Sequence, residues 1–176
     1  MGATNPIRRI LILRHAKSDW TAGAASDFER PLNDRGRRAA ATMGAFLADE
    51  CRAPSLVLCS SARRAAETWS IIAHHWAEAP EATLDRSLYL ARMQDLLKRL
   101  RCLEDDVNIV CLVGHHPGHD GLAITLTKDR AAPEAIAMQL KFPTAALAEL
   151  SYSGLWADLS PGSAQLERFV RPKDLI

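Results

Sequence analysis

The chain has 176 residues, 48% of them hydrophobic, which suits one compact domain spanning residues 1–176. Its 22 basic and 21 acidic side chains give a formal net charge of +1, too little for a global field that attracts nucleic acid or an anionic membrane. No run approaches the roughly 18 apolar residues of a membrane span, and the four cysteines lack a CxxC spacing. We therefore expect a cytoplasmic protein that binds neither nucleic acid nor membrane.

The first predicted strand is an unbroken aliphatic run. Residues 1–6 suit a disordered leader, and residues 7–13 lack polar alternation, which is typical of a central parallel strand covered on both faces. The strand runs directly into Arg14 and His15. Residues 17–29 have no period and should form a loop that leaves this strand end. The carboxyl end of a strand is where α/β proteins place their chemistry.

A helix and a second strand follow. The helix should begin with Asn33 or Asp34 as its N-cap and end by Cys51, and residues 55–59 read as a buried strand. Ser60 and Ser61 should cap the next helix, which places Arg64 in its first turn. A cation there opposes the helix dipole unless something negative binds nearby.

The remaining elements repeat this alternation. The sequence predicts a loop or short extended piece over 83–90, a helix over 93–103, a strand over 107–113 that runs into Gly114 and His115, and a helix over 119–127. Residues 145–152 and 163–170 read as strands, and residues 155–159 as a further short strand. The polar stretch 128–134 has no predicted structure.

This order predicts an α/β fold: a three-layer α/β/α sandwich with a mostly parallel central sheet and antiparallel strands near the C-terminus. If the first three long strands are parallel, their carboxyl ends bring Arg14, His15, Arg64 and His115 to one rim. Forked guanidinium groups match phosphoryl oxygens, and a neutral imidazole can accept a phosphoryl group.

Other chemistries fit these residues less well. A rim without a carboxylate cluster is a poor metal site and a poor glycosidase. His115, His116, His119 and Asp120 could suggest zinc, but Pro117 and Gly118 interrupt the helical spacing, so we expect neither metal nor cofactor.

Three motifs in this order resemble the histidine phosphatases, the phosphoglycerate mutase-like superfamily. Leu13-Arg14-His15 matches the family's strand-end Arg-His-Gly. Ser60, Arg64-Ala65 and Thr68 match Ser-x-x-x-Arg-Ala-x-x-Thr, and Gly114-His115 matches the second histidine. The resemblance runs from Ile10 to about Tyr152 and implies the phosphoglycerate mutase-like fold.

Further features look like the SixA-type phosphohistidine phosphatase branch. They are the short length, Arg30-Pro31-Leu32 with Gly36 beyond, and Phe142-Pro143-Thr144 before a late strand. The resemblance implies that His15 accepts the phosphoryl group, that Arg14 and Arg64 clamp its oxygens, and that His115 donates to it. Arg30 is expected near the rim as a further phosphate contact.

Two departures from the family pattern bear on the substrate. Ala16 replaces the glycine after the histidine, and His116 follows His115 where some relatives carry an acid. Asp85 and Asp120 remain as candidate general acids. A site without an acid favours a leaving group such as the imidazole of phosphohistidine, so we expect a metal-independent phosphatase that acts on a phosphohistidine-bearing protein in signal transduction. The alternatives are a small-molecule phosphomonoesterase and a non-catalytic phosphate-dependent binding or regulatory module.

Overall fold

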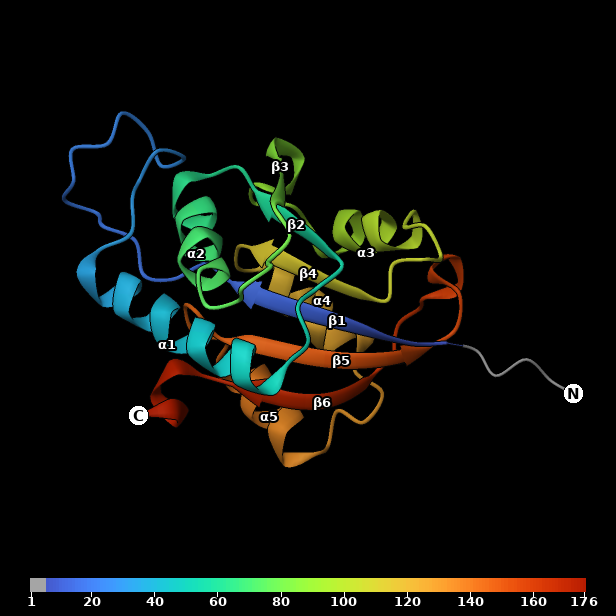
Figure 1. Ribbon diagram of the computed structural model, residues 1–176. Coiled ribbons are helices and arrows are strands. Elements are labelled where there is room, and N and C mark those ends of the chain that lie inside the picture. The colour runs from blue at the N-terminus through green and yellow to red at the C-terminus, as the bar shows by residue number, and fades with distance from the viewer. Residues whose placement is uncertain (1–5) are drawn as a thin grey trace, which may run out of the picture.

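A mixed six-stranded sheet organises residues 6–176, the part of the chain described by the computed structural model. The strand order is β3-β2-β4-β1-β5-β6 (Figure 1). Strands β1 to β4 are parallel, β5 is antiparallel to β1, and β6 is antiparallel to β5. This confirms the mostly parallel sheet with antiparallel C-terminal strands. The strands are β1 (Ile7–Arg14), β2 (Leu56–Ser60), β3 (Ala82–Asp85), β4 (Ile109–Gly114), β5 (Leu147–Ser153) and β6 (Gln165–Val170).

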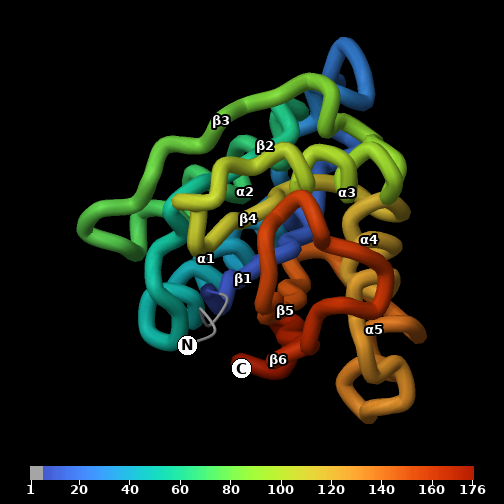
Figure 2. Tube along the Cα trace, turned by 90° about the vertical axis from the view of Figure 1, so that its right-hand side faces the viewer, coloured from blue at the N-terminus to red at the C-terminus, as the bar shows by residue number. Residues whose placement is uncertain are grey.

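The helices lie in two layers, one on each face of the sheet. Figure 2 shows α3, α4 and α5 on the opposite side of the sheet from α1 and α2, as the predicted three-layer sandwich requires. The helices are α1 (Asp34–Glu50), α2 (Arg63–Ala73), α3 (Met93–Arg101), α4 (Gly118–Leu126) and α5 (Pro133–Leu140), with short 3-10 helices η1 (Arg86–Leu88), η2 (Trp156–Asp158) and η3 (Pro172–Leu175). None of the helices in residues 6–176 is long and apolar enough to cross a membrane.

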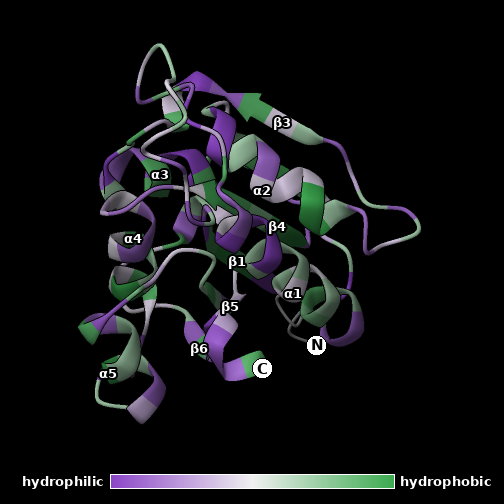
Figure 3. Ribbon diagram, turned by 90° about the vertical axis from the view of Figure 1, so that its left-hand side faces the viewer, coloured by the Kyte–Doolittle hydropathy of each residue, from purple (hydrophilic) through white to green (hydrophobic). Residues whose placement is uncertain are grey.

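The central residues of strand β1, 10–13, are all apolar because both faces of the strand are buried there. Leu11 and Leu13 pack into the cluster formed with α1 and α2, and Ile10 and Ile12 pack into the cluster formed with α3, α4 and α5. Figure 3 shows the hydrophobic colour of the central strands between more polar helices. Each such side chain contributes about 1.5–3 kcal/mol when fully buried, so the run that predicted the strand also anchors both helix layers.

Two stretches differ from the prediction. Residues 155–159 do not form a strand, because Trp156 is wholly buried in η2, where its indole N–H donates to the Val107 carbonyl at 3.0 Å and lies near the Arg8 guanidinium. The unassigned stretch 128–134 leads into α5, which begins at Pro133, a residue suited to the first turn of a helix. Of the predicted leader, residues 1–5 lie outside the described residues, and Pro6 precedes β1 without regular structure.

The sheet has one rim that collects the segments described below. In register, Arg14 at the end of β1 lies beside Gly114 at the end of β4, and Leu13 lies beside Leu147 of the antiparallel β5. Leu147 in turn pairs with Val170 at the end of β6. The residues after β1, β2, β4 and β6 and those before β5 therefore emerge at the same side, which we call the strand-end rim.

Candidate active site

Four side chains predicted from the sequence meet at the strand-end rim. The backbone amide of His15 donates to the Gly114 carbonyl at 2.9 Å, which joins the end of β1 to the end of β4. The rings of His15 and His115 have centroids 5.0 Å apart. Arg64 reaches both histidines: its Nε lies 3.2 Å from Nε2 of His15, and its Nη2 lies 3.4 Å from Nδ1 of His115. Strands β1 and β4 and helix α2 thus bring these groups together.

The imidazole of His15 is held in one tautomer. Its Nδ1 lies 2.7 Å from the carbonyl oxygen of Ala16, which can only accept, so Nδ1 carries the proton. Nε2 then presents its lone pair, which accepts from Arg64. Burial, followed by the positive charges of Arg64, Arg14 and Arg30, outweighs the Ala16 bond and lowers the pKa of His15 to about 3. The ring is therefore neutral and nucleophilic at neutral pH, and Ala16 supplies the orienting carbonyl despite replacing glycine.

His115 is held in the opposite tautomer. Its Nδ1 faces the guanidinium of Arg64, a donor only, so the proton resides on Nε2 and is donated to the Ser60 hydroxyl at 2.8 Å. Burial lowers the pKa of His115 to about 2, followed by repulsion from His15 in its protonated form and from the charge of Arg64. The ring of His115 is therefore neutral and lies beside the guanidinium of Arg64.

Ser60 does not cap α2 as predicted. Its hydroxyl, at the end of β2, contacts His115 and accepts from the Ala62 amide at 3.3 Å. The N-cap residue of α2 is Ala62, which makes no side-chain cap bond. The reason is geometric, since the Ser60 hydroxyl is directed toward β4 and so cannot serve the amides deeper in the helix.

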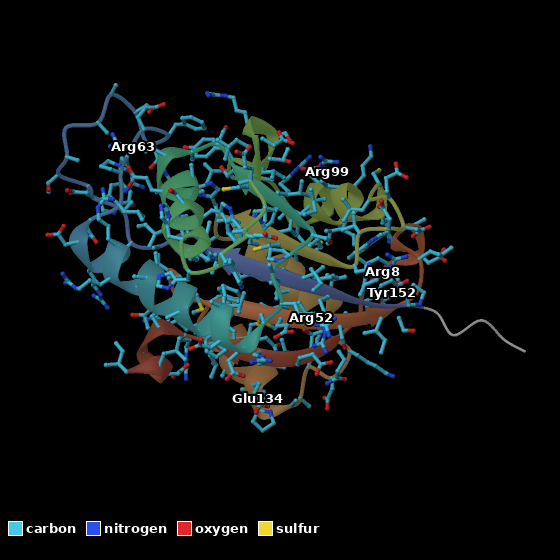
Figure 4. All side chains as sticks on the ribbon, in the orientation of Figure 1. Arg8, Arg52, Arg63, Arg99, Glu134 and Tyr152 are labelled. Atoms are coloured by element: carbon cyan, nitrogen blue, oxygen red, sulfur yellow. The ribbon has the colours of Figure 1, made fainter. Side chains whose placement is uncertain are left out.

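The first turn of α2 carries two arginines, one exposed and one buried. Arg63 points outward, pairs with Glu67 at 2.8 Å and appears at the outer side of α2 in Figure 4, whereas Arg64 is only 3% exposed. One turn later, the Thr68 hydroxyl accepts from the Ala16 amide at 2.9 Å and donates to the Arg64 carbonyl at 2.6 Å. Thr68 thereby connects the backbone beside His15 to the helix that carries Arg64.

Arg14 lies on the other side of His15. Its Nη1 donates to the Phe142 carbonyl at 2.6 Å, and its Nε is buried without a partner among the described residues. Burial lowers the pKa of Arg14, and the negative charge of Asp120 partly opposes this. The Ala145 amide bonds to the carbonyls of both Arg14 and His15, with Ala145 at φ 60°, a costly conformation for a non-glycine residue. The segment before β5 therefore braces the strand end.

The rim also contains one carboxylate, that of Asp27, which the sequence patterns did not indicate. Asp27 accepts from Nη2 of Arg64 at 3.0 Å through its side chain and from Nη1 at 2.6 Å through its carbonyl. The Tyr89 hydroxyl donates to the same carboxylate at 2.5 Å, and Arg30 donates to its other oxygen at 2.9 Å. The Tyr89 bond, together with Arg30 and Arg64, lowers the pKa of Asp27 to about 2.

Sequence analysis missed Asp27 and Tyr89. Asp27 falls in the aperiodic loop 17–29, and its i, i+3 spacing to Arg30 was the one local signal of a contact. Arg30 itself lies at the rim as expected: it donates to Ser18 at 2.7 Å, and its guanidinium stacks 3.5 Å from the Trp20 ring centroid. These bonds hold the loop against Arg64.

The two acids considered from the sequence occupy different places. Asp85 accepts from the Ser87 amide at 2.8 Å and caps η1. Asp120, in the first turn of α4, contacts Nδ1 of His116 at 2.7 Å through Oδ2, while Oδ1 is buried without a partner among the described residues. Its charge acts on Arg14. Of these two acids, Asp120 therefore lies nearer to Arg14.

The histidines after β4 do not gather around a common point. His119 is wholly buried and accepts from the His115 amide at 3.2 Å, whereas His116 is exposed and contacts Asp120. In the described part of the chain, no three His, Cys, Asp or Glu side chains are arranged to hold a metal ion.

The chain and its fold are similar to those of known proteins. Residues 10–89 match the model of the histidine phosphatase superfamily (branch 1). An uncharacterized protein from Mycobacterium tuberculosis is 38% identical over 163 residues, covering 92% of this chain and 100% of the relative. A solved structure described as a candidate phosphohistidine phosphatase SixA from Nakamurella multipartitia superposes with a TM-score of 0.84 at 26% identity over 97% of this chain and 99% of that one. A second, from Agrobacterium tumefaciens, gives 0.79 at 27% identity over 95% and 99%.

Proposed function

Because the chain belongs to the histidine phosphatase superfamily, in its SixA-type branch, and is therefore a phosphatase, we propose that it hydrolyses phosphohistidine in a protein through a phosphoryl intermediate on His15. The fixed tautomer and the neutral charge of the ring support His15 as the acceptor. The whole chain acts as one histidine phosphatase domain without metal or cofactor. Four free cysteines support a reducing, cytoplasmic setting. A phosphohistidine-bearing protein as substrate would place the reaction in signal transduction.

Transfer proceeds in two displacements. The Nε2 lone pair of His15 attacks phosphorus, the P–N bond to the substrate imidazole breaks, and that imidazole leaves with the bonding pair and takes a proton from water. Water then attacks the phosphoryl group on His15. The P–N bond breaks, the lone pair returns to Nε2, and inorganic phosphate leaves.

Charge stabilisation comes from Arg14, Arg64 and His115. The guanidinium groups of Arg14 and Arg64 bind the equatorial oxygens, where transition-state charge is spread. His115 faces the same position through Nδ1, and the negative charge of a phosphoryl group favours its protonated form, which then donates. Arg30 supplies positive charge behind Asp27.

The observation that carries the substrate class is the state of Asp27. The Asp27 carboxylate contacts Arg64, and its pKa is about 2. It is therefore ionised at neutral pH and has no proton to give. An alkoxide leaving group requires a proton donor, whereas imidazole leaves readily. The site therefore favours phosphohistidine over phosphate esters of alcohols.

The test is to incubate the protein with a labelled phosphohistidine peptide. We expect acid-labile label on His15 and release of phosphate, both lost in His15→Ala. His74→Ala, at an exposed histidine just after α2, is the matched control and should behave as wild type. Unchanged turnover in His15→Ala contradicts the mechanism. Tight peptide binding without turnover of any phosphoryl donor favours a binding module instead.

One observation favours a second candidate, a small-molecule phosphomonoesterase. Asp120 pairs with His116, its Oδ1 is buried without a partner among the described residues, and its charge acts on Arg14, so this pair is the candidate proton donor for an ester oxygen. Rates on a panel of sugar and nucleotide monoesters decide between the two. A strong preference for one monoester, lost in Asp120→Asn, would reverse the ranking.

A further inference from the structure

A cationic groove opens at the strand-end rim beside Arg14. It has a volume of about 210 Å³ and is lined by the basic side chains of Lys17, Arg35, Lys141, Arg171 and Lys173. We propose that the cationic groove binds an acidic segment of the phosphoprotein substrate next to its phosphohistidine. This inference rests on the proposed function and names the kind of protein on which it acts.

The topology brings the groove and the site to the same side. Lys17 follows the end of β1, Lys141 precedes β5, and Arg171 follows β6, and all three segments emerge where Leu13, Leu147 and Val170 lie in register. Arg35, in the first turn of α1, closes the groove against the chain after β1. Four segments far apart in sequence thus contribute cations to one surface.

The groove lies next to Arg14, one of the two arginines that the proposed mechanism assigns to the phosphoryl oxygens. Arg14 donates to the carbonyl of Phe142, and the residues on either side of Phe142, Lys141 and Pro143, both line the groove. Lys17 is two residues beyond His15, so their Cα atoms lie within about 7 Å of each other. A peptide whose phosphohistidine reaches His15 therefore has its neighbouring residues within reach of the groove.

Most of the positive charge of the groove is not paired by the described residues. Within residues 6–176, the side chains of Lys17, Arg35, Lys141 and Lys173 make no ion pair and no hydrogen bond, and all four are exposed. Only Arg171 is paired, with Asp174 at 2.8 Å. A chain with a net charge of +1 has no general excess of cations, so four unpaired ones in one groove mark a local preference for anions.

The form of the groove favours a peptide over a small phosphate compound. A phosphate pocket gathers buried, convergent donors on one point, whereas four of these five cations are exposed, and they share the groove with Ala39, Pro143 and Pro172. That arrangement suits an extended segment with several carboxylates and an occasional aliphatic side chain. Complementary charge of this kind steers encounter and selects partners.

The experiment compares two phosphohistidine peptides that differ only in the flanking residues, a run of glutamates in one and a run of glutamines in the other. The wild-type protein should have a KM about tenfold lower for the acidic peptide, since several exposed ion pairs act together. The double variant Lys141→Glu/Lys173→Glu should remove or reverse this ratio. The control Lys98→Glu/Lys128→Glu changes the net charge equally at exposed lysines that do not line the groove.

Ionic strength provides a second readout. At about 1 M salt, where the Debye length is about 3 Å, the preference for the acidic peptide should disappear in the wild type. Equal KM values for both peptides at low salt, or loss of the preference in the control variant, would overturn the groove proposal.

Failure of the proposed function gives a different result. If neither peptide is hydrolysed, binding of the unphosphorylated acidic peptide is measured by fluorescence anisotropy. Binding that is lost in Lys141→Glu/Lys173→Glu but kept in the control supports the groove while the phosphohistidine activity fails. The absence of binding overturns the groove as well.

Discussion

The carboxylate of Asp27 lies 3.0 Å from Nη2 of Arg64, so an acid of the loop 17–29 occupies part of the guanidinium that the proposed mechanism assigns to phosphoryl oxygens. A bound phosphoryl group competes with Asp27 for these N–H groups. Asp27 also accepts hydrogen bonds from Arg30 and Tyr89, so the loop 17–29 and Arg64 belong to one hydrogen-bonded network.

Replacing this acid should strengthen the binding of anions. Asp27→Asn removes the negative charge and is expected to tighten inhibition by phosphate or vanadate about two- to fivefold, the usual range for one partly exposed ion pair. Competitive inhibition constants measure the effect. Asp19→Asn, in the same loop, is the control, because among the described residues the Asp19 carboxylate accepts hydrogen bonds from Thr21 alone. Weaker inhibition in Asp27→Asn would mean that the carboxylate is needed to orient Arg64.

The buried histidines should make stability fall in mild acid. Burial lowers the pKa of His15, His115 and His119 to about 3, 2 and 4, below the ordinary value of 6.5. Between about pH 6.5 and 4 the unfolded chain binds protons that the folded chain does not, so the free energy of unfolding decreases as pH falls. Each histidine contributes a slope of up to about 1.4 kcal/mol per pH unit.

Denaturant titrations across this range check the slope. His119→Gln should make it shallower, whereas His74→Gln changes an exposed residue and should leave it as in the wild type. An equal slope in His119→Gln would contradict the assignment of a neutral buried ring at position 119.

The Thr68 hydroxyl should matter for both stability and rate. Thr68→Val keeps the shape but leaves the buried amide of Ala16 without its acceptor, at a cost of about 1–3 kcal/mol. Because the Ala16 carbonyl orients His15, kcat should fall as well. Thr68→Ser restores the hydroxyl and should recover most of both losses. A Ser variant as impaired as the Val variant would point to packing of the methyl group instead.

Gly114 leaves no room for a side chain. A Cβ at this position would overlap the ring of His119, so Gly114→Ala should destabilise the fold by about 1–3 kcal/mol. In Gly121→Ala the nearest atom to the new Cβ is Met93 Cβ at 3.6 Å, and alanine favours the helix, so this control should be neutral or stabilising by up to about 1 kcal/mol. Thermal unfolding of both variants tests the contrast.

Local patterns predicted most of the architecture. The apolar runs predicted β1, β2, β4 and β5 to within two residues, because strands covered on both faces are mostly apolar in their central residues. The N-cap at Asn33 is confirmed by its bond from the Gly36 amide at 2.8 Å. The pattern failed at Trp156, where an apolar segment fills the core from a 3-10 helix instead of a strand.

The sequence by itself determined the fold class, the family and the approach of Arg14, His15, Arg64 and His115 to one rim, because strand ends and their motifs are local features of the chain. Their catalytic roles stay predictions. Only the tertiary structure decided that Asp27 and Tyr89 hold Arg64, that Ser60 serves His115, and that Lys17, Arg35, Lys141, Arg171 and Lys173 share a groove. These contacts depend on strand order and on the path of an aperiodic loop, and neither leaves a period in the sequence.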